Sequence, residues 1–506
     1  MIRTNRCKMI YDNLLSIAAR APRTSGLRQD GRFQSYGQLV ERIARLAAGL
    51  SAHGIGVGDP VAILLPNSPE LFVVVHALFA IGAIAMPLGL TATRSECSSA
   101  ARKAGAAALI ASADLAELGR QVAEDAGGTR HLPVFVAGGA GDFSLGALER
   151  AAPIRLPRLD GRTPGLYLLS SGSTGLPKVV PHTHAQLLAD GRRTGAAWRL
   201  TPDDVVFDML PGNFAMGLLL GAMDAAEAGA TTVYWSDPRP LVLARRDLLA
   251  ALAAEKITVM GAVPAMYETL AGAPGEIRLP AMRLVFSGGA GLRRSTYDRF
   301  RERFGIPIRQ DYGSTEAIMV SHNDAGDIDR LWASVGRPAG DALVRITPAD
   351  TGLGPGVGEL MVKSSSLTSG YLGEDEVNAS SFRDGWLMTG DLARLDDDGH
   401  IFIVGRSKLL IEVSGFKIDP IEVEEALQLH PGVAEAVVVG VRVARHAEPR
   451  LKAFVVRKNE VSPEQLIRFL RQRLSVHKVP TLIEFCDALP KSSAGKVLRS
   501  RLSEQA

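Results

Sequence analysis

Residues 165–180 read GLYLLSSGSTGLPKVV, and the fold can be inferred outward from this stretch. Leu166–Leu169 is a short apolar run of strand type. It leads into small hydroxylated and glycine residues that end at Pro177 and Lys178. Glycines let backbone N–H groups approach an anion, hydroxyls donate hydrogen bonds, and a lysine adds charge. The stretch therefore predicts a phosphate-binding loop after a buried strand. The residues expected to hold phosphate are Ser171, Gly172, Ser173, Thr174, Gly175 and Lys178.

This loop differs from a Walker loop, in which glycine, lysine and serine or threonine run directly into a helix. Here Pro177 separates the last glycine from the lysine and denies the next turn an N–H donor. An ordinary Ser/Gly turn is the alternative interpretation.

The chain has 506 residues, too many for one hydrophobic core. This length predicts about three domains, or one large and one small domain. The net charge of +3 gives no reason to expect nucleic acid or an anionic membrane as a partner. Cys7, Cys97 and Cys486 are too widely spaced for a disulfide framework or a metal knuckle. We therefore expect a reducing, cytoplasmic setting.

Leu71–Leu90 is about as long and apolar as a transmembrane helix. Gly82 and Pro87 divide it, however, into a helix over Glu70–Ile81 and a strand over Ala83–Met86. We therefore expect a buried core helix packed on a sheet and no membrane insertion. The N-terminal segment lacks the apolar core of a secretory signal.

Helical and strand patterns alternate along the first part of the chain. The expected elements are helices at Tyr36–His53 and Arg94–Lys103 and strands at Val61–Leu65, Ala107–Ile110, near Val233 and Val259, and at Leu284–Phe286. This alternation predicts an α/β fold with parallel sheets covered by helices.

Residues 311–317 read DYGSTEA. A tyrosine can stack on a flat ring, hydroxyls can bond phosphate, and a carboxylate can hold Mg²⁺. The alternative is a strand-end turn that starts a helix, with Glu316 in its first turn. His182 and His184 have no cysteine or carboxylate nearby, so we interpret them as loop residues and not as metal ligands.

Four more motifs follow in the second half of the chain. They are Thr389-Gly390-Asp391, Gly405-Arg406-Ser407-Lys408, Ser414-Gly415-Phe416-Lys417 and, at residues 490–496, PKSSAGK. Together with the two earlier motifs, the series resembles the adenylate-forming superfamily. That superfamily contains AMP-forming acyl-CoA and aryl-CoA ligases, firefly luciferases and the adenylation domains of non-ribosomal peptide synthetases. The resemblance extends from about Tyr36 to Arg499.

The resemblance implies a nucleotide site. The phosphate loop would cradle the β and γ phosphates of ATP. Tyr312 would stack on adenine, Thr315 would bond the α-phosphate, and Glu316 would hold Mg²⁺. Asp391, helped by Arg406, would bind both ribose hydroxyls.

The resemblance also implies two domains that move. An N-terminal AMP-binding domain over residues 1–404 would be followed by a small, mobile α+β lid domain over residues 407–506, with a hinge near Lys408. One orientation would bring Lys496 to the attacking carboxylate and the α-phosphate, where charge builds up. The other would bring the Ser414-Gly415 loop to the channel for thiol attack. The elements expected in the lid are helices at Ile421–His430 and Ser462–Ser475 and strands at Val433–Val439 and Leu451–Val456.

Residues 210–220, LPGNFAMGLLL, are expected to contact the acid. Phe214 stands where many CoA ligases have histidine, and Asn213 stands where amino-acid-activating domains have aspartate. An amide cannot neutralise an ammonium group, so an α-amino acid is disfavoured. The pair is similar to that of ligases for hydroxybenzoic acids, in which the asparagine bonds a ring hydroxyl. Gly288 and Gly289 resemble strand-end glycines that floor the acid pocket, with a plain tight turn as the alternative.

The activity implied is that of an ATP-dependent, AMP-forming carboxylic acid:CoA ligase. An aryl or short to medium acyl acid would attack Mg²⁺-bound ATP, and coenzyme A would then displace AMP to give a thioester. A stand-alone adenylation enzyme that loads a carrier protein is the alternative, and a luciferase-like oxygenase would share the first half-reaction. We expect a monomer or homodimer. The sequence leaves open which acid is activated and which thiol accepts it.

Overall fold

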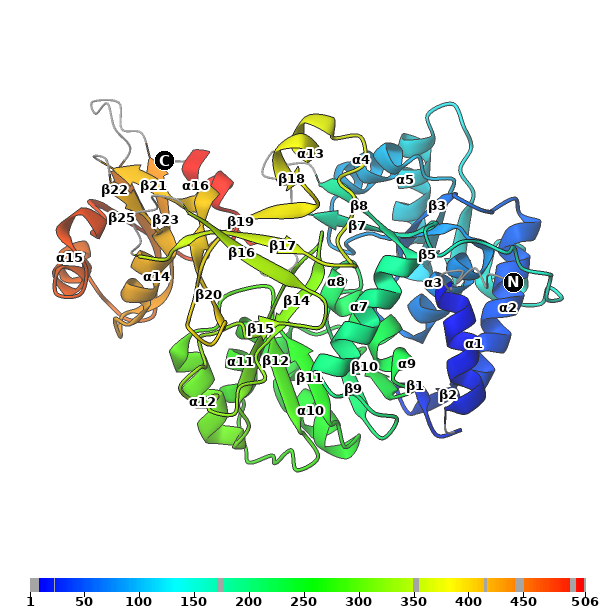
Figure 1. Cartoon of the computed structure of the whole chain (residues 1–506), viewed down its shortest axis with the longest axis horizontal. Coiled ribbons are helices and arrows are strands. Elements are labelled where there is room, and N and C mark those ends of the chain that lie inside the picture. Colours follow the sequence, from blue (N-terminus) through cyan, green and yellow to red (C-terminus); the bar gives the residue numbers. More distant parts are fainter. Residues whose placement is uncertain are drawn as a thin grey trace. The chain divides into compact units, whose positions relative to one another are not determined.

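The computed structural model describes residues 9–21, 23–170, 177–348, 355–413, 416–441, 450–491 and 497–504. Contacts within the chain divide it into two compact units. The first holds Met1–Leu343 and Val362–Leu387, and the second holds Val344–Met361 and Met388–Ala506. Figure 1 labels the helices and strands of both.

The first unit contains a six-stranded sheet in the order β6-β5-β3-β4-β7-β8. Its strands are β3 (Pro60–Leu64), β4 (Ile84–Pro87), β5 (Ala108–Ser112), β6 (Val134–Ala137), β7 (Pro164–Ser170) and β8 (Lys178–Thr183). All neighbours pair in parallel except β7 and β8, which pair antiparallel. The strand predicted before the phosphate loop is thus present as β7.

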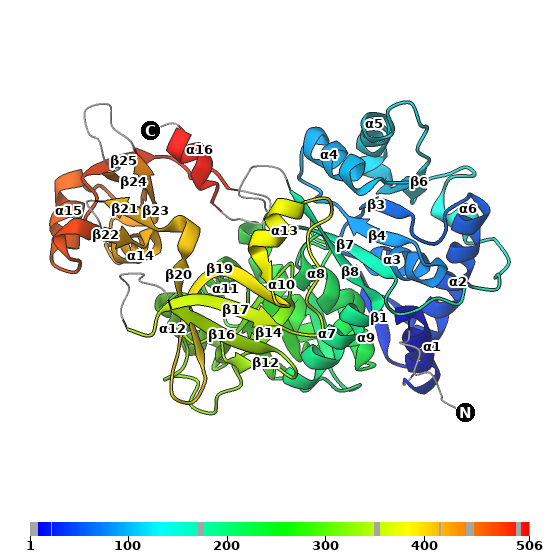
Figure 2. The same cartoon turned by 45° about the horizontal axis from the view of Figure 1, so that its top comes forward.

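Helices cover both faces of this sheet (Figure 2). They are α2 (Tyr36–Ala52), α3 (Pro69–Ile81), α4 (Arg94–Ala104) and α5 (Ala116–Gly127), with short helices η1 (Ala113–Leu115) and α6 (Leu145–Leu148). Along β3, Val61 and Ile63 join the core that includes α2 and α3, whereas Ala62 and Leu64 join the core that includes α4 and α5. Because successive residues of a strand face opposite sides of the sheet, this one apolar strand contributes side chains to two hydrophobic cores.

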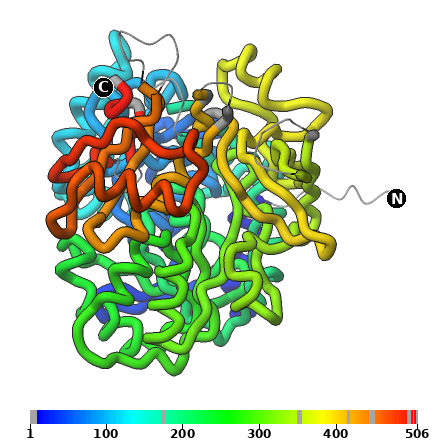
Figure 3. The backbone as a smooth tube through the Cα atoms, turned by 90° about the vertical axis from the view of Figure 1, so that its left-hand side faces the viewer, coloured from blue at the N-terminus to red at the C-terminus, as the bar shows by residue number. Residues whose placement is uncertain are grey.

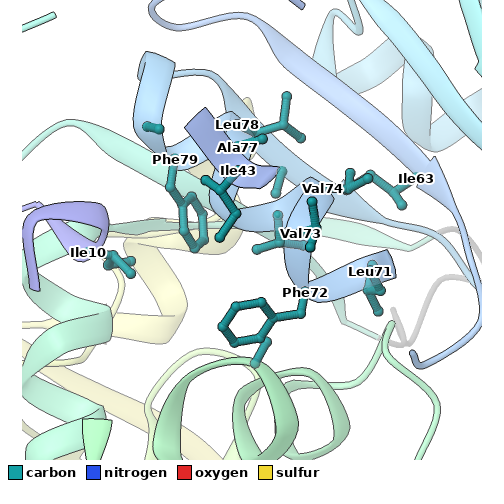
Figure 4. Close-up of a cluster of buried hydrophobic side chains, with 14 of the residues drawn as sticks. Ile10, Ile43, Ile63, Leu71, Phe72, Val73, Val74, Ala77, Leu78 and Phe79 are labelled. Atoms are coloured by element: carbon teal, nitrogen blue, oxygen red, sulfur yellow. The ribbon is translucent and has the colours of Figure 1, made fainter. Parts of the chain in front are cut away.

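Helix α3 is the helix expected inside the long apolar run. The Ser68 hydroxyl accepts a hydrogen bond from the Leu71 N–H at 3.2 Å, Pro69 occupies the first helical turn, and Gly82 ends the helix with a φ of +75°. Apart from Glu70, every residue of α3 is buried (Figure 4). None of the helices in the described parts of the chain combines the length and the apolar character needed to cross a membrane.

A nine-stranded sheet completes the first unit, in the order β15-β14-β13-β12-β11-β9-β10-β1-β2. Its strands are β1 (Gly26–Gln29), β2 (Arg32–Ser35), β9 (Val205–Asp208), β10 (Thr231–Tyr234), β11 (Val259–Ala262), β12 (Leu284–Ser287), β13 (Ile308–Ser314), β14 (Ile318–His322) and β15 (Arg337–Pro338). In sheet order, β13, β12, β11, β9, β10 and β1 pair in parallel with their neighbours. Antiparallel strands flank them, with β14 and β15 at one edge and β2 at the other. The associated helices are α1 (Ile10–Arg20), α7 (His184–Ala197), α8 (Ala215–Leu219), the π-helical turn η2 (Leu220–Asp224), α9 (Ala225–Glu227), α10 (Leu241–Ala254), α11 (Pro264–Ala271) and α12 (Arg294–Phe304). The predicted α/β fold is confirmed.

A five-stranded sheet has the order β16-β17-β19-β18, with β20 paired to β19. Its elements are β16 (Leu343–Pro348), β17 (Gly358–Lys363), α13 (Asp375–Ser381), β18 (Phe382–Arg383), β19 (Trp386–Leu395) and β20 (Ile401–Arg406).

The rest of the second unit is a small α+β body, which runs from yellow-orange to red in Figure 3. Its elements are η3 (Ser407–Leu409), β21 (Ile411–Val413), β22 (Phe416–Ile418), α14 (Pro420–Gln428), β23 (Val433–Val441), β24 (Arg450–Arg457), α15 (Pro463–Arg471), η4 (Val476–Lys478), β25 (Leu482–Cys486) and α16 (Arg499–Glu504). Ser462 caps α15 in a capping box with Gln465, but α15 ends at Arg471 and not, as predicted, at Ser475. The smaller α+β domain is therefore present.

Candidate active site

The DYGSTEA motif forms the end of β13 and a tight turn into β14. Its interpretation as the start of a helix is wrong, because Ser314 ends one strand and Ile318 begins the next, antiparallel strand. A Cβ on Gly313 would lie 2.1 Å from the Ile318 carbonyl oxygen, so only glycine fits there. Ile318 has a φ of +57°, which is strained for a β-branched residue. Such strain persists only where surrounding contacts hold the backbone.

Three hydrogen bonds from outside the turn supply that support. The His182 Nε2–H donates to the Thr315 carbonyl at 2.8 Å, and the Thr368 N–H donates to the Glu316 carbonyl at 2.9 Å. The Ser366 hydroxyl donates to the Ala317 carbonyl at 2.7 Å. The turn therefore presents the half-buried Thr315 and Glu316 side chains from a backbone fixed at three consecutive carbonyls.

A buried ion pair on α7 supports the same turn. Asp190 and Arg193 have side chains that are each 2% exposed, and they pair at 3.0 Å. Asp190 also accepts the Met319 N–H at 3.1 Å, and Arg193 donates to Ser366 and pairs with Asp341 at 2.7 Å. Removing either partner would leave a buried unpaired charge, at a cost of about 3–5 kcal/mol, so both side chains are needed where α7 meets the turn.

His182 and His184 are not loop residues, contrary to the prediction from sequence. His182 lies in β8, His184 begins α7, and both are 0% exposed. His76 on α3 is buried as well and contacts the Ala222 carbonyl at 2.8 Å. Burial lowers the pKa of all three imidazoles to about 4, so they are neutral at pH 7.

These histidines predict a loss of stability in acid. As pH falls below about 6.5, the unfolded chain binds protons at the three sites before the folded chain does, so the free energy of unfolding decreases until about pH 4. Neither ring nitrogen of His184 has a hydrogen-bond partner. We therefore expect the His184→Leu variant to have the wild-type free energy of unfolding at pH 8. Between pH 8 and pH 4 this free energy should decrease by about 3 kcal/mol less in the variant than in the wild type. Urea unfolding between pH 4 and pH 8 measures both values.

His182→Leu is the matched variant for that experiment. It also removes a titrating group, but it breaks the bond to the Thr315 carbonyl. It should therefore lower the free energy of unfolding at pH 8, whereas towards pH 4 the removal of the titrating group should offset this loss. A wild-type pH dependence in His184→Leu would show that His184 does not contribute to acid unfolding.

The flanks of the phosphate loop form a hairpin. Ser170 at the end of β7 lies opposite Lys178 at the start of β8 in antiparallel pairing. A strand, and not the helix of a Walker loop, therefore follows the loop. The Lys178 Nζ lies 4.9 Å from the ring centroid of Tyr371, and the Tyr371 hydroxyl donates to Glu316 Oε1 at 2.9 Å. Tyr371 thus contacts both Lys178 and Glu316.

The residues expected to contact the acid lie at the start of α8 and after β12. Asn213 and Phe214 are half-buried and directly precede α8. A Cβ on Gly288 would lie 3.2 Å from the Met216 sulfur, so Met216 of α8 packs against this strand-end glycine. Gly289 has a φ of +77°, which favours glycine at the turn. The structure thus places α8, through Met216, against the glycine turn that follows β12.

In the second unit, Asp391 on β19 lies opposite Arg406 on β20, and the Arg406 Nε lies 2.6 Å from Asp391 Oδ1. The Asp391 side chain is 6% exposed and that of Arg406 is 52% exposed. The Thr389 hydroxyl donates to the Leu360 carbonyl at 2.7 Å and accepts the Asp391 N–H at 3.1 Å. Gly390 donates its N–H to Glu359 at 2.9 Å. These bonds fix the backbone that carries Asp391.

Several predicted site residues lie outside the described residues. They are Ser171, Gly172, Ser173, Thr174 and Gly175 of the phosphate loop, Ser414, Gly415 and Lys496. The backbone of Lys408 lies in the short helix η3.

Two family models match this chain. That of the AMP-binding enzymes matches residues 16–372, and that of the AMP-binding enzyme C-terminal domain matches residues 422–496. The chain belongs to the AMP-binding enzyme family.

Known members of the family cover nearly the whole of this AMP-binding enzyme. A feruloyl-CoA synthase of an Amycolatopsis species is 32% identical over 492 residues, which are 96% of each chain. A 2,3-dihydroxybenzoate-AMP ligase of Bacillus subtilis is 30% identical over 93% of this chain and 88% of its own length. The ATP-bound structure of MatB from Rhodopseudomonas palustris matches with a TM-score of 0.88 at 28% identity, over 98% of both chains. The predicted adenylate-forming acid–thiol ligase is confirmed.

Sequence reasoning missed the part of this AMP-binding enzyme that holds the turn. Ser366, Thr368 and Tyr371 were not predicted as site residues. The stretch of residues 364–371 reads SSSLTSGY, and its density of hydroxyl groups after a strand whose alternate residues are buried was the available signal.

Proposed function

We propose that this AMP-binding enzyme activates an aryl carboxylic acid with ATP and transfers it to coenzyme A. The observation that carries the proposal is the strained turn at residues 314–318, whose backbone is held at three carbonyls. Tyr371 contacts both Glu316 of this turn and Lys178. A fixed backbone suits catalysis of phosphoryl chemistry, which depends on positioning and on charge.

The nucleotide contacts follow the motif positions. The phosphate loop, from Ser171 to Lys178, binds the β and γ phosphates. Tyr312 stacks on adenine, and Thr315 bonds the α-phosphate. Asp391 takes the ribose hydroxyls with help from Arg406.

The donor set suits Mg²⁺, which prefers oxygen ligands and is usually held by one or two carboxylates together with substrate phosphates. Glu316 supplies such a carboxylate, half-buried at a fixed turn. A bound Mg²⁺ would neutralise charge on the ATP phosphates. Lys496 brings positive charge to the meeting point of the substrate carboxylate and the α-phosphate, and Tyr371 orients the Glu316 side chain.

An aryl acid fits the pocket better than an amino acid. Phe214 and Met216 offer apolar side chains, Gly288 and Gly289 have no side chain to fill the space for a ring, and Asn213 can bond a ring hydroxyl. The feruloyl and dihydroxybenzoate relatives act on aromatic acids by their names, which supports this class. A short to medium acyl acid is the next candidate.

Asn213→Ala should change selectivity. We expect kcat/KM for a hydroxybenzoate to fall about tenfold relative to unsubstituted benzoate, because one hydrogen bond to the ring hydroxyl is lost. Pyrophosphate release with the two acids measures this ratio. An unchanged ratio would place Asn213 away from the ring hydroxyl.

The proposal also covers the movement of the C-terminal lid and the thiol that accepts the acyl group. Residues 407–506 rotate as a lid about Lys408, so that Lys496 and the Ser414-Gly415 loop serve the two half-reactions in turn. The alternative acceptor is the thiol of a carrier protein. We further propose a cytoplasmic location and a monomer or homodimer.

Magnesium- and ATP-dependent pyrophosphate release tests the function. The assay uses benzoic, hydroxybenzoic, cinnamic and fatty acids with and without CoA, and products are identified by mass. An aryl-CoA thioester supports the proposal. An adenylate that leaves CoA unused points to a carrier protein, and release with fatty acids alone would overturn the aryl class.

A further inference from the structure

Residues 364–372 form a segment, here called the crossing segment, that joins the predicted phosphate and metal sites. The Thr368 hydroxyl donates to the Pro181 carbonyl at 2.6 Å, and the Leu372 N–H donates to the Val179 carbonyl at 2.9 Å. Both acceptors lie in β8, which begins at Lys178. Since Ser366 and Thr368 also bond the turn before β14, the crossing segment fixes β8 and the turn together.

Tyr371 is anchored in this segment by its backbone. Its N–H donates to Asn378 Oδ1 at 2.7 Å, and its carbonyl accepts from Asn378 Nδ2 at 2.8 Å. The ring also lies against Phe382, with the centroids 5.7 Å apart. The side chain therefore has a defined direction, with the hydroxyl on Glu316 and a ring contact with Lys178.

We propose that Tyr371 is a positioning residue that holds the Glu316 carboxylate and the Lys178 ammonium group apart and ready for Mg²⁺ and phosphate. This inference rests on the proposed function, because it takes Glu316 as the metal ligand and Lys178 as a phosphate contact.

The physical reason is the attraction between the two charges. A carboxylate and an ammonium group near a protein surface attract each other by about 4 kcal/mol at 4 Å. None of the ion pairs between described residues joins Lys178 to Glu316. Tyr371 offers each charge a separate partner: a hydroxyl donor for the carboxylate and a ring contact for the ammonium group.

Tyr371→Phe tests this role, because it removes the hydroxyl and keeps the ring. Binding of a fluorescent ATP analogue is measured while Mg²⁺ is titrated. We expect the Mg²⁺ concentration for half-maximal binding to rise about tenfold, since a hydrogen bond to a charged group is lost. The KM for the acid should stay unchanged. An unchanged Mg²⁺ titration would overturn the proposal.

Tyr297→Phe is the matched control. Tyr297 on α12 also donates its hydroxyl to a carboxylate, that of Asp329. The control should bind the analogue with the wild-type Mg²⁺ dependence. A shift equal to that of Tyr371→Phe would mean that loss of any such bond loosens the protein, and would overturn a specific role.

A double-mutant cycle with Glu316→Gln tests whether Tyr371 acts through the carboxylate. If it does, Tyr371→Phe should cause no further shift once Glu316 is an amide. Two independent, additive shifts would overturn the proposal. Failure of the proposed function has a different signature: the wild-type protein would release no pyrophosphate with any acid, whatever the binding titrations show.

Discussion

Replacing Lys496 with alanine is expected to reduce acyl adenylate formation by about a hundred- to a thousand-fold or more. The substrate carboxylate and the α-phosphate are both anions, and negative charge grows where they meet. A fixed positive charge at that point lowers the barrier more than it strengthens substrate binding. Thiol attack on a finished adenylate does not join two such anions. The variant should therefore still form thioester from a supplied adenylate.

Pyrophosphate release measures the first half-reaction, and thioester formation from a synthetic aryl adenylate measures the second. Lys491→Ala is the matched control, because Lys491 lies in the same motif but pairs with Glu435 at 2.5 Å and is partly exposed. The control should keep both half-reactions. If Lys496→Ala lost both half-reactions equally, the lysine would have a general structural role and not the assigned one.

Local signals account for most of what could be predicted of the fold. The apolar run of α3 could be read as a helix because Ser68, Pro69 and Gly82 act within one turn of its ends. Likewise, β3 and β7 are continuous apolar runs of strand length. Such patterns lie within a few neighbouring residues, so they can be recognised in a single sequence.

The turn before β14 shows where local reasoning fails. Serine, threonine and glutamate at residues 314–316 suit a helix start as well as a turn. Hydrogen bonds from Ser366 and Thr368 stabilise the turn. These residues lie about fifty positions further along the chain, so no pattern near residues 314–316 reveals the bonds. The buried His182 was missed for a related reason: polar residues are usually exposed unless paired, and its partner, the Thr315 carbonyl, lies 133 residues further along.

Asp391→Ala is expected to weaken ATP binding by about a hundredfold or more. The carboxylate is proposed to accept both ribose hydroxyls, and each hydrogen bond to a charged group contributes about 1.5–3 kcal/mol. Arg406 is 52% exposed, so water can solvate its guanidinium once Asp391 is gone. The free energy of unfolding should therefore change little. Calorimetric titration with ATP and urea unfolding measure the two effects.

Arg406→Met provides the opposite case. It removes the Arg406 guanidinium, at 2.6 Å, from the Asp391 carboxylate, which is only 6% exposed. Removing one partner of an ion pair whose carboxylate is nearly buried should lower the free energy of unfolding by about 3 kcal/mol. The two variants should thus separate binding from folding at one ion pair. Equal destabilisation by both, with ATP affinity preserved in Asp391→Ala, would make the pair a structural link between β19 and β20 and would move the ribose site elsewhere.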